Sequence, residues 1–565
     1  MAIEKIDTTP NERTAEEMHD FYEAYWQGEV KIKFNKLKVL KLLKRLGYYW
    51  YVPPKEEHRE NAEMMQAKQG FIVQIKDNRI RIVSDVDVQY AFADYIRALP
   101  GLEKEFTKKV VNEGQIEYEP FKYTITPTLL EEKMLNNISN LFNQDMIYHL
   151  RPGVEDPKIL IQDDTIDEKY IYFNNCVVRV TRDAVEYINY KDLDGYIWEN
   201  NILYRDLEYT EEVGDYEVFI NDICGYDPNN SNPQVRAKGK ARKKSLMSIM
   251  GYLMHNNYET DRKALIFTDV NEEDAAEANG RTGKGLIGKA LRAIINRNEG
   301  DCRYLVVPGK DFEFKDTRYS GGDISTQLIH IEDIKTKTFD FEDFFNDVTD
   351  GCKFRKLHQN PIIHNSKIMI STNHTVNLTG SASKMGRAIV FELENYYSDT
   401  FTPSMKFGRL FFGSKWEKKD WMQFYSFMVR CAAEYMRNGL IKPEMVHYIE
   451  RIIEENLPSD FVYYLEHHIQ VSVALQRRLE LNKRTLYDGF VQKYPELVKY
   501  QQGFTKWVCS YLTLKKIPSA HVRTNRDEDY TDLFVLYPDS TEKVYKWIYK
   551  KPEAKQTADP QMSIE

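Results

Sequence analysis

With 565 residues the chain is long enough for roughly three or four domains, and its 42% hydrophobic and 29% charged residues are typical of a soluble globular protein. The net charge of −9, from 78 basic and 87 acidic residues, argues against a protein that coats nucleic acid, and it restricts any such contact to one face or pore. No apolar run approaches the ~18 residues that span a bilayer, and the six cysteines include no C-x-x-C pair for zinc binding or disulfide exchange.

The N-terminal region alternates helix and strand patterns. Its first seven residues are typical of neither a signal peptide nor a transit peptide, so we expect a cytoplasmic protein. An amphipathic helix pattern with a basic face covers 34–46, and strand patterns cover 71–75 and 79–83. These elements predict a small α+β or winged-helix module at 1–115. Its basic helix face is either a DNA contact or, as the sequence favours, a solvated surface.

Residues 116–215 are rich in strands and aromatic side chains. Three strand patterns between 170 and 188 predict a meander in a second α+β module. Acidic pairs at 163–164 and 167–168 have the residue type of a metal-dependent primase or polymerase site. We interpret them as turn residues, because no His or Cys cluster accompanies them.

The densest basic run of the chain lies at 236–244. It follows a turn-rich break at 229–233 and leads into an apolar helix pattern at 246–254. Two interpretations of the run stay open: a flexible segment that contacts DNA or another subunit, and a solvated linker.

A short apolar strand pattern from Lys263, a Gly-containing turn and a helix pattern follow one another, which is the order that a phosphate-binding loop requires. Such a turn directs backbone N–H groups and the positive end of the helix dipole at one point. The match to G-x-x-x-x-G-K-[ST] is incomplete, because Ala278 replaces the first Gly and Gly285 replaces the hydroxyl that binds Mg²⁺. The sequence predicts that ATP is bound by Asn279, Gly280, Arg281, Thr282, Gly283, Lys284, Gly285 and Leu286.

Four further residues, beside three strand patterns, suit roles in phosphoryl transfer. A buried-strand pattern ends at Glu332 and Asp333, which suit a Mg²⁺ ligand and a group that orients the attacking water. Another strand pattern ends at Asn373, which suits a contact to the γ-phosphate or to that water. Arg387 precedes a third strand. In a ring of subunits, an Arg at this place reaches across the subunit boundary to the transition-state charge on the neighbour's nucleotide. Each position alone is weak, but their joint order and spacing indicate an ATPase.

With these motifs the stretch 246–440 resembles the superfamily 3 helicases, AAA+ DNA motors of viruses and plasmids, and among them the phage and poxvirus-type primase-helicase branch. The resemblance rests on Asn279–Leu286, Leu328–Asp333, Ile370–Asn373 and Gly386–Ile389. In such helicases a pore hairpin lies between the acidic strand and the Asn strand and grips DNA phosphates. The resemblance assigns that role to four residues, Lys353, Arg355, Lys356 and His358.

The fold implied is a multidomain α/β protein with an AAA+ P-loop ATPase core at 263–400. The small α+β domains (1–115 and 116–215) and a helical collar with the basic segment (216–262) precede the core. A helical region (401–470), a winged-helix-like module (471–550) and a disordered tail (551–565) follow it.

We therefore expect an ATP-dependent replicative DNA helicase with ATP and Mg²⁺ as cofactors, acting in a bacterial host cell if it is phage-encoded. Its expected partners are single-stranded or forked DNA, further copies of itself in a ring (a hexamer by resemblance), and a primase or polymerase of the same replicon, but no membrane. Two alternatives stay open: a primase-helicase whose N-terminal half makes primers, and an AAA+ switch that assembles on DNA without unwinding it.

Overall fold

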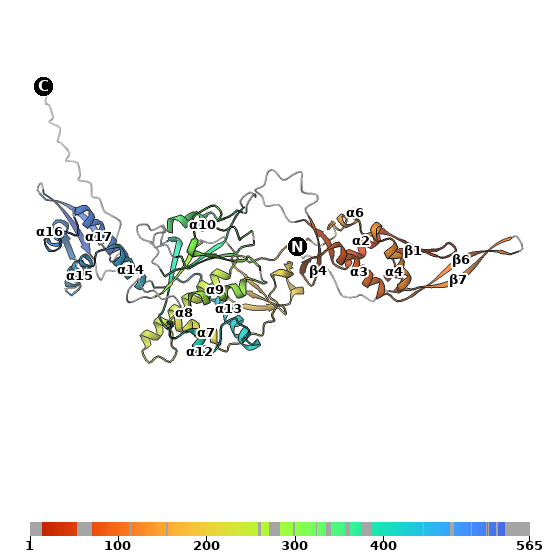
Figure 1. Ribbon diagram of the computed structural model, residues 1–565, viewed down its shortest axis with the longest axis horizontal. Helices are drawn as coiled ribbons and strands as arrows, with labels where there is room; N and C mark the ends of the chain where they lie inside the picture. The colour runs from red at the N-terminus through yellow and green to blue at the C-terminus, as the bar shows by residue number, and fades with distance from the viewer. Residues whose placement is uncertain are drawn as a thin grey trace, which may run out of the picture. The chain divides into compact units, whose positions relative to one another are not determined.

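The computed structural model shows two compact units, Met1–Glu208 (unit 1) and Tyr209–Glu565 (unit 2) (Figure 1). The expectation of a multidomain α/β protein is confirmed, and one of its sheets is parallel. No helix within the described residues is both long and apolar enough to cross a membrane. The structure describes residues 14–52, 70–112, 115–153, 156, 158–257, 262–269, 283–297, 300–323, 325–334, 341–355, 362–373, 386–444, 446–474, 479–498, 500–515, 517, 519–526 and 529–536.

Unit 1 combines short helices with small, mostly antiparallel sheets. Its helices are α1 (Ala15–Met18), α2 (Lys36–Arg45), α3 (Asp85–Arg97), α4 (Pro127–Asn136), α5 (Ile138–Leu141) and α6 (Gln144–Tyr148). Its strands are β1 (Tyr22–Trp26), β2 (Val30–Phe34), β3 (Tyr48–Tyr51), β4 (Phe71–Lys76), β5 (Arg79–Ile82), β6 (Leu102–Asn112), β7 (Gln115–Ile125), β8 (Lys169–Tyr172), β9 (Val177–Val180), β10 (Val185–Ile188) and β11 (Ile197–Trp198).

The predicted helix, hairpin and meander of unit 1 are confirmed as α2, β4–β5 and β8–β10. Strand β3 is buried on both faces, because Tyr48 and Trp50 enter one hydrophobic core while Tyr49 and Tyr51 enter another. The short strand β11 pairs with β5, so it joins the sheet of the preceding residues. The module boundary expected at 115 falls inside a two-stranded ribbon, β6–β7, that extends from the rest of unit 1 (Figure 1).

Unit 2 contains the parallel sheet and most of the long helices. Its helices include α7 (Asp215–Ile223), α8 (Pro233–Met254), α9 (Lys284–Ile295), α10 (Phe345–Thr349), α12 (Pro403–Phe407), α13 (Lys418–Asn438), α14 (Val446–Asn456), α15 (Ser459–Ala474), α16 (Lys483–Lys493) and α17 (Gln501–Leu514). Its strands include β12 (Ala264–Asp269), β13 (Tyr304–Pro308), β14 (Leu328–Glu332), β15 (Cys352–Phe354), β16 (Ile362–His364), β17 (Lys367–Ser371), β18 (Ala388–Leu393), β19 (Leu479–Asn482), β20 (Ser519–Arg526) and β21 (Asp529–Leu536).

The five-stranded sheet has the order β13-β14-β17-β12-β18, and every pairing is parallel. All residues of β12, β17 and β18 are buried, which is the pattern of strands covered on both faces. The strand patterns that end at Asp333 and Asn373 and the one that follows Arg387 are confirmed as β14, β17 and β18. The helix pattern after the phosphate loop is confirmed as α9.

The basic run at 236–244 is not a flexible segment, because it forms part of helix α8. Asn232 caps this helix by accepting hydrogen bonds from the backbone N–H groups that follow it. The Arg242 guanidinium donates a 2.6 Å hydrogen bond to the carbonyl oxygen of Glu392, and Lys243 Nζ lies 2.7 Å from a Glu217 carboxylate oxygen. Acidic and carbonyl groups of α7 and β18 therefore hold two of the run's cations inside the unit.

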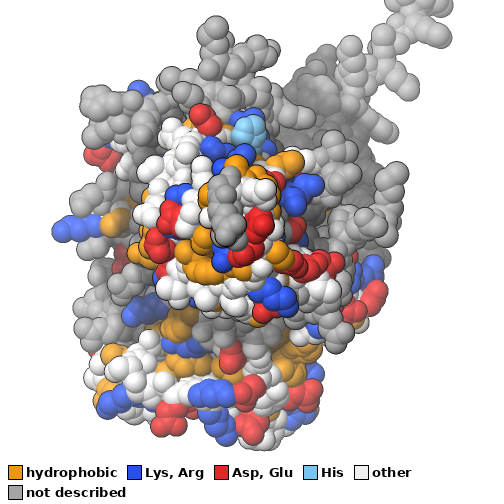
Figure 2. Space-filling view, turned by 90° about the vertical axis from the view of Figure 1, so that its right-hand side faces the viewer, with side chains coloured by type: hydrophobic (Ala, Val, Ile, Leu, Met, Phe, Trp, Pro, Cys, Tyr) orange, Lys and Arg blue, Asp and Glu red, His pale blue; other side chains and the backbone are white. Residues whose placement is uncertain are grey.

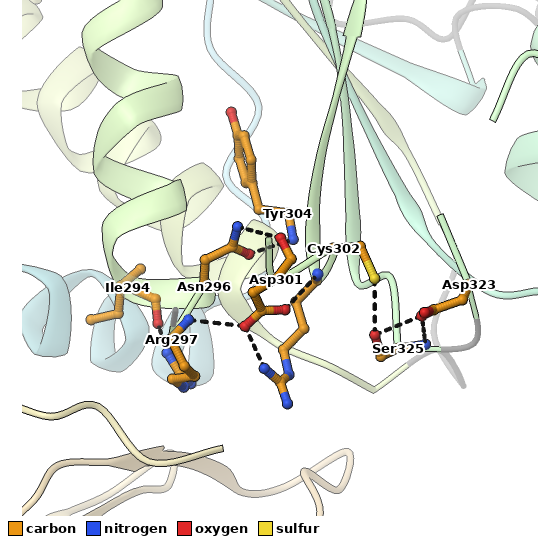
Figure 3. Close-up of polar contacts among 9 residues, drawn as sticks. Ile294, Asn296, Arg297, Asp301, Cys302, Tyr304, Asp323 and Ser325 are labelled. Carbon is orange, nitrogen blue, oxygen red and sulfur yellow. Dashed lines mark hydrogen bonds and ion pairs between the residues drawn. The ribbon is translucent and has the colours of Figure 1, made fainter. Parts of the chain in front are cut away.

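A polar network joins the end of α9 to the start of β13 (Figure 3). The Asn296 amide donates to the Asp301 carbonyl oxygen (2.8 Å) and accepts from the Tyr304 backbone N–H (2.7 Å). The Asp301 carboxylate accepts from the backbone N–H groups of Arg297 (2.9 Å) and Arg303 (3.0 Å). This network fixes the end of α9 that lies away from Lys284.

The C-terminal part of unit 2 consists of α14 to α17 and the antiparallel sheet β19-β21-β20. Its core is aromatic, with Phe461, Phe490 and Phe504 fully buried. The predicted order of two helices followed by a strand is confirmed by α16, α17 and β21. The tail at 551–565 lies outside the described residues.

Candidate functional site

Polar side chains gather at the carboxyl edge of the parallel sheet. Asp269 ends β12, Glu332 ends β14, and Asn373 lies two residues beyond β17. Because the strands are parallel, these three ends lie at one edge, which is where open α/β sheets bind their ligands.

Lys284 is the first residue of α9, and its side chain contacts residues from two of the strand ends at this edge. It follows Gly283, whose φ of +113° and close approach to the Phe219 ring (2.6 Å from a would-be Cβ) accept only glycine. The Lys284 side chain is buried, and its Nζ donates hydrogen bonds to carboxylate Oδ2 of Asp269 and amide Oδ1 of Asn373. The predicted residues Lys284 and Asn373 therefore meet.

Backbone contacts join the loops that carry these side chains. The Thr372 backbone N–H donates to the Phe267 carbonyl oxygen (3.1 Å), and its hydroxyl donates to the Ile334 carbonyl oxygen (3.1 Å). The Ile334 N–H donates to the carbonyl oxygen of Ser371 (3.3 Å). The ends of β12, β14 and β17 are thus hydrogen-bonded to one another, which fixes Asn373 relative to the acidic strand end.

Glu332 ends β14 and Asp333 follows it, and both acids are exposed. A Cβ built on Gly285 would lie 3.7 Å from carboxylate Oε1 of Glu332, so Glu332 stands beside the position of the missing hydroxyl. Asp333 adopts a left-handed backbone conformation (φ +56°), which directs the chain away from the strand. An exposed carboxylate beside Gly285 fits Mg²⁺, which proteins bind through one or two carboxylates plus substrate phosphates.

A buried polar chain crosses the sheet behind this edge. The His330 imidazole, in β14, shares hydrogen bonds with the hydroxyl of Tyr304 (Nδ1, 2.8 Å) and with the hydroxyl of Ser371 (Nε2, 2.5 Å). Burial lowers the pKa of His330 to about 4, so the ring is neutral at neutral pH. Helix α9 packs against these hydrogen-bonded side chains through Gly288, where a Cβ would lie 2.8 Å from the Tyr304 hydroxyl.

Arg387 lies at the opposite edge of the sheet. It directly precedes β18, which runs parallel to β12, so it stands beside the start of β12. The six residues of β12 separate the two edges by roughly 20 Å. The Arg387 guanidinium lies over the Phe345 ring, with its central carbon 4.7 Å from the ring centroid. The structure does not bring Arg387 to the Lys284 site of the same chain.

The predicted hairpin between the acidic strand and the Asn strand exists as the antiparallel pair β15–β16. Lys353 Nζ and the Arg355 guanidinium both contact the Asp316 carboxylate, at 2.9 and 3.1 Å. Lys356 and His358, and the loop residues Asn279 to Thr282, lie outside the described residues.

The sequence interpretation missed Asp269, although an acid at the end of the strand before the phosphate loop was a usable signal. Of the acids between 163 and 168, Asp164 and Glu168 have structural partners, which agrees with their interpretation as turn residues. The Asp164 carboxylate accepts from the Tyr170 backbone N–H (2.8 Å) and pairs with Lys169 (2.8 Å). The Glu168 carboxylate pairs with Arg179.

Neither a protein-family model nor a curated protein matches this chain.

Proposed function

We propose that the chain is an ATP-dependent DNA helicase with the architecture of the superfamily 3 AAA+ motors. One observation carries the proposal: Lys284, at the start of the helix after a glycine turn, meets Asp269 and Asn373 at the carboxyl edge of a parallel sheet. A cation at a helix N-terminus, beside strand-end carboxylates, is the arrangement that binds and cleaves a nucleoside triphosphate.

In this proposal the phosphates of ATP displace Asp269 and Asn373 from the Lys284 ammonium. The Asn373 amide is then free to orient the attacking water or to contact the γ-phosphate. Glu332 or Asp333 would hold Mg²⁺, and the other acid would orient that water. When bound, Mg²⁺ neutralises charge that develops on the phosphates.

The position of Arg387 supports a ring. A residue roughly 20 Å from Lys284 does not act on the same nucleotide, so a role of Arg387 in hydrolysis requires the nucleotide of a neighbouring subunit. An arginine supplied by a neighbour stabilises transition-state charge and makes hydrolysis depend on assembly. We therefore propose a homo-oligomer, a hexamer by resemblance, with ATP bound between subunits.

The hairpin β15–β16 is the proposed DNA-gripping element. Its position between β14 and β17 matches the pore hairpin of the resembling helicases, and Lys353 and Arg355 give it positive charge. At the C-terminus, helices α16 and α17 followed by the β20–β21 hairpin support a winged-helix module.

A mixing experiment tests the intersubunit site. Lys284→Ala and Arg387→Ala are each expected to lower ATP hydrolysis by about 10²-fold or more. When the two inactive variants are mixed in equal amounts, about one interface in four carries both wild-type residues, so about a quarter of the wild-type rate returns. Mixtures that stay inactive would contradict the neighbour role of Arg387.

The helicase proposal itself is tested by unwinding of a forked duplex. Wild-type protein with ATP and Mg²⁺ is expected to separate the strands, and Lys284→Ala is not. The second candidate, an AAA+ switch that assembles on DNA, is favoured by Gly285, which removes a Mg²⁺-binding hydroxyl. Wild-type ATP hydrolysis without any unwinding would favour the switch, and ribonucleotide primer synthesis on a single-stranded template would favour the primase-helicase.

A further inference from the structure

A cavity of about 420 Å³ opens beside the β4–β5 hairpin of unit 1. Half of the residues that line it are cationic: its lining comprises Gln74, Lys76, Asp77, Arg79, Arg81 and Glu199. The volume is in the range of small-molecule sites. No motif of the proposed ATPase includes these residues.

The strand register places the cations together. Lys76 pairs with Arg79 across the hairpin, and Gln74 pairs with Arg81, so all four side chains project from one face of the sheet. Like charges directly opposite each other destabilise a strand pair. Within the described part of the chain, none of the three cations forms an ion pair, although Asp77 and Glu199 line the same cavity. Asp77 and Glu199 therefore offset the repulsion only from beyond ion-pairing distance.

Both arginines are already oriented. The Arg79 guanidinium stacks over the buried Tyr190 ring at 3.9 Å and donates one hydrogen bond to the Asn174 carbonyl oxygen (3.1 Å). The Arg81 Nε donates to amide Oε1 of Gln74 (2.8 Å). Each guanidinium retains further N–H donors, and a planar fork held in place loses little entropy when it binds an oxyanion.

We propose that this cavity binds a phosphate group, carried by a free nucleotide or by a nucleic-acid strand. Two oriented arginine forks and a lysine match the charge and geometry of phosphate oxygens. Phosphate would also relieve the repulsion between Lys76 and Arg79. Figure 2 shows that acidic, basic and hydrophobic side chains are interspersed on the end of unit 1 that carries the β6–β7 ribbon, so that face offers no single-sign field for nucleic acid.

The test uses the full chain and measures binding of two probes: ATP by calorimetry, and a fluorescent 12-nucleotide single strand by anisotropy. Arg79→Gln/Arg81→Gln is compared with Lys38→Gln/Lys41→Gln, which removes the same charge from the exposed face of α2. Only the cavity variant is expected to change binding. For ATP, one of two binding sites is lost. For the strand, the dependence of log affinity on log salt concentration becomes shallower by roughly 1.4, which corresponds to two phosphate contacts.

The two probes identify the source of the phosphate. A change with ATP alone assigns the cavity to nucleotides, and a change with the strand alone assigns it to nucleic acid. The charge-preserving variant Arg79→Lys/Arg81→Lys keeps the cations but removes the forks, so an intermediate loss is expected. The proposal is overturned if the cavity variant binds both probes like wild type, or if the α2 variant weakens binding equally. Loss of phosphate-loop binding in Lys284→Ala leaves this result unchanged, so failures of the two proposals are distinguishable.

Discussion

Two cationic sites of this protein differ in how their charge is compensated. In unit 2, the buried Lys284 ammonium contacts the Asp269 carboxylate and the Asn373 amide oxygen. In unit 1, Lys76, Arg79 and Arg81 line an open cavity, and none forms an ion pair among the described residues. A buried cation without a counterion is costly, whereas exposed cations are stabilised by water.

The difference determines what a ligand must do at each site. At Lys284, an incoming phosphate competes with Asp269 for a cation that is already paired, so binding is linked to release of that carboxylate. At the unit 1 cavity, where no described acid forms an ion pair with these cations, a phosphate adds negative charge in direct contact with them and relieves repulsion. The same group is thus expected to rearrange one site and to stabilise the other.

The largest expected effect comes from removing the buried cation. Lys284→Met leaves the Asp269 carboxylate buried without its partner, and we expect the free energy of unfolding of unit 2 to fall by about 3–5 kcal/mol. Denaturant unfolding measures this loss. In the double variant Lys284→Met/Asp269→Asn the uncompensated charge is gone, so most of the stability should return. Lys76→Gln at the exposed cavity, in contrast, should leave stability within about 0.5 kcal/mol of wild type, and an equally large loss there would break the comparison.

Acid is expected to weaken unit 2 through His330. Its native pKa is about 4, below the ordinary value of 6.5, so between these values the unfolded chain binds a proton that the native chain does not. The free energy of unfolding should therefore fall as the pH drops from 6.5 to 4, by about 3 kcal/mol in total. Urea unfolding at several pH values, compared between wild type and His330→Gln, isolates this contribution. Parallel pH curves for the two proteins would show that His330 does not titrate in this way.

A smaller effect is expected where α9 packs on the sheet. A Cβ at Gly288 would lie 2.8 Å from the Tyr304 hydroxyl and 2.9 Å from the His330 ring, so Gly288→Ala must displace the helix that carries Lys284. Overpacking of this kind destabilises by about 1–3 kcal/mol. Gly386→Ala is the matched control, because no atom of the described residues lies within 4 Å of its Cβ position. Thermal unfolding of both variants, with the control unchanged, checks the prediction.

Local patterns were sufficient to predict the strands and helices that build the proposed ATPase site. Lys284 begins the helix that follows β12, and Asn373 follows β17. Because the carboxyl ends of parallel strands lie at one edge of a sheet, the two residues could be expected to meet. The basic run in α8 was not predictable as ordered helix, since its partners Glu217 and Glu392 are distant in sequence. Contacts between residues far apart in the sequence determine whether such a basic run is an ordered helix. A local charge pattern carries no information about those contacts.

The unit 1 cavity shows the same limit. The sequence predicted the β4–β5 hairpin, and the alternation of side chains along it places Lys76, Arg79 and Arg81 on one face. What orients Arg79 comes from Tyr190 and Asn174, about a hundred residues later in the chain. The alternation along the strands therefore accounts for the shared face of these charges, but the stacking that holds Arg79 in place depends on residues far along the chain.

The smallest expected effect concerns the missing hydroxyl of the phosphate loop. Gly285→Ser places a Cβ 3.7 Å from Glu332 Oε1, an ordinary contact, so we expect stability to stay within about 0.5 kcal/mol of wild type. The new hydroxyl adds a ligand beside the carboxylates, and a net gain of about 1 kcal/mol would lower the Mg²⁺ concentration for half-maximal ATP hydrolysis by roughly five-fold. Titration of Mg²⁺ at saturating ATP measures this shift. If Gly285→Ser leaves the titration unchanged while Glu332→Gln shifts it, then the carboxylate alone determines Mg²⁺ binding and the glycine is no defect. If neither variant shifts the Mg²⁺ titration, Mg²⁺ is not bound beside Lys284. The difference between the two cationic sites would then need an explanation that does not involve a metal-assisted ATPase in unit 2.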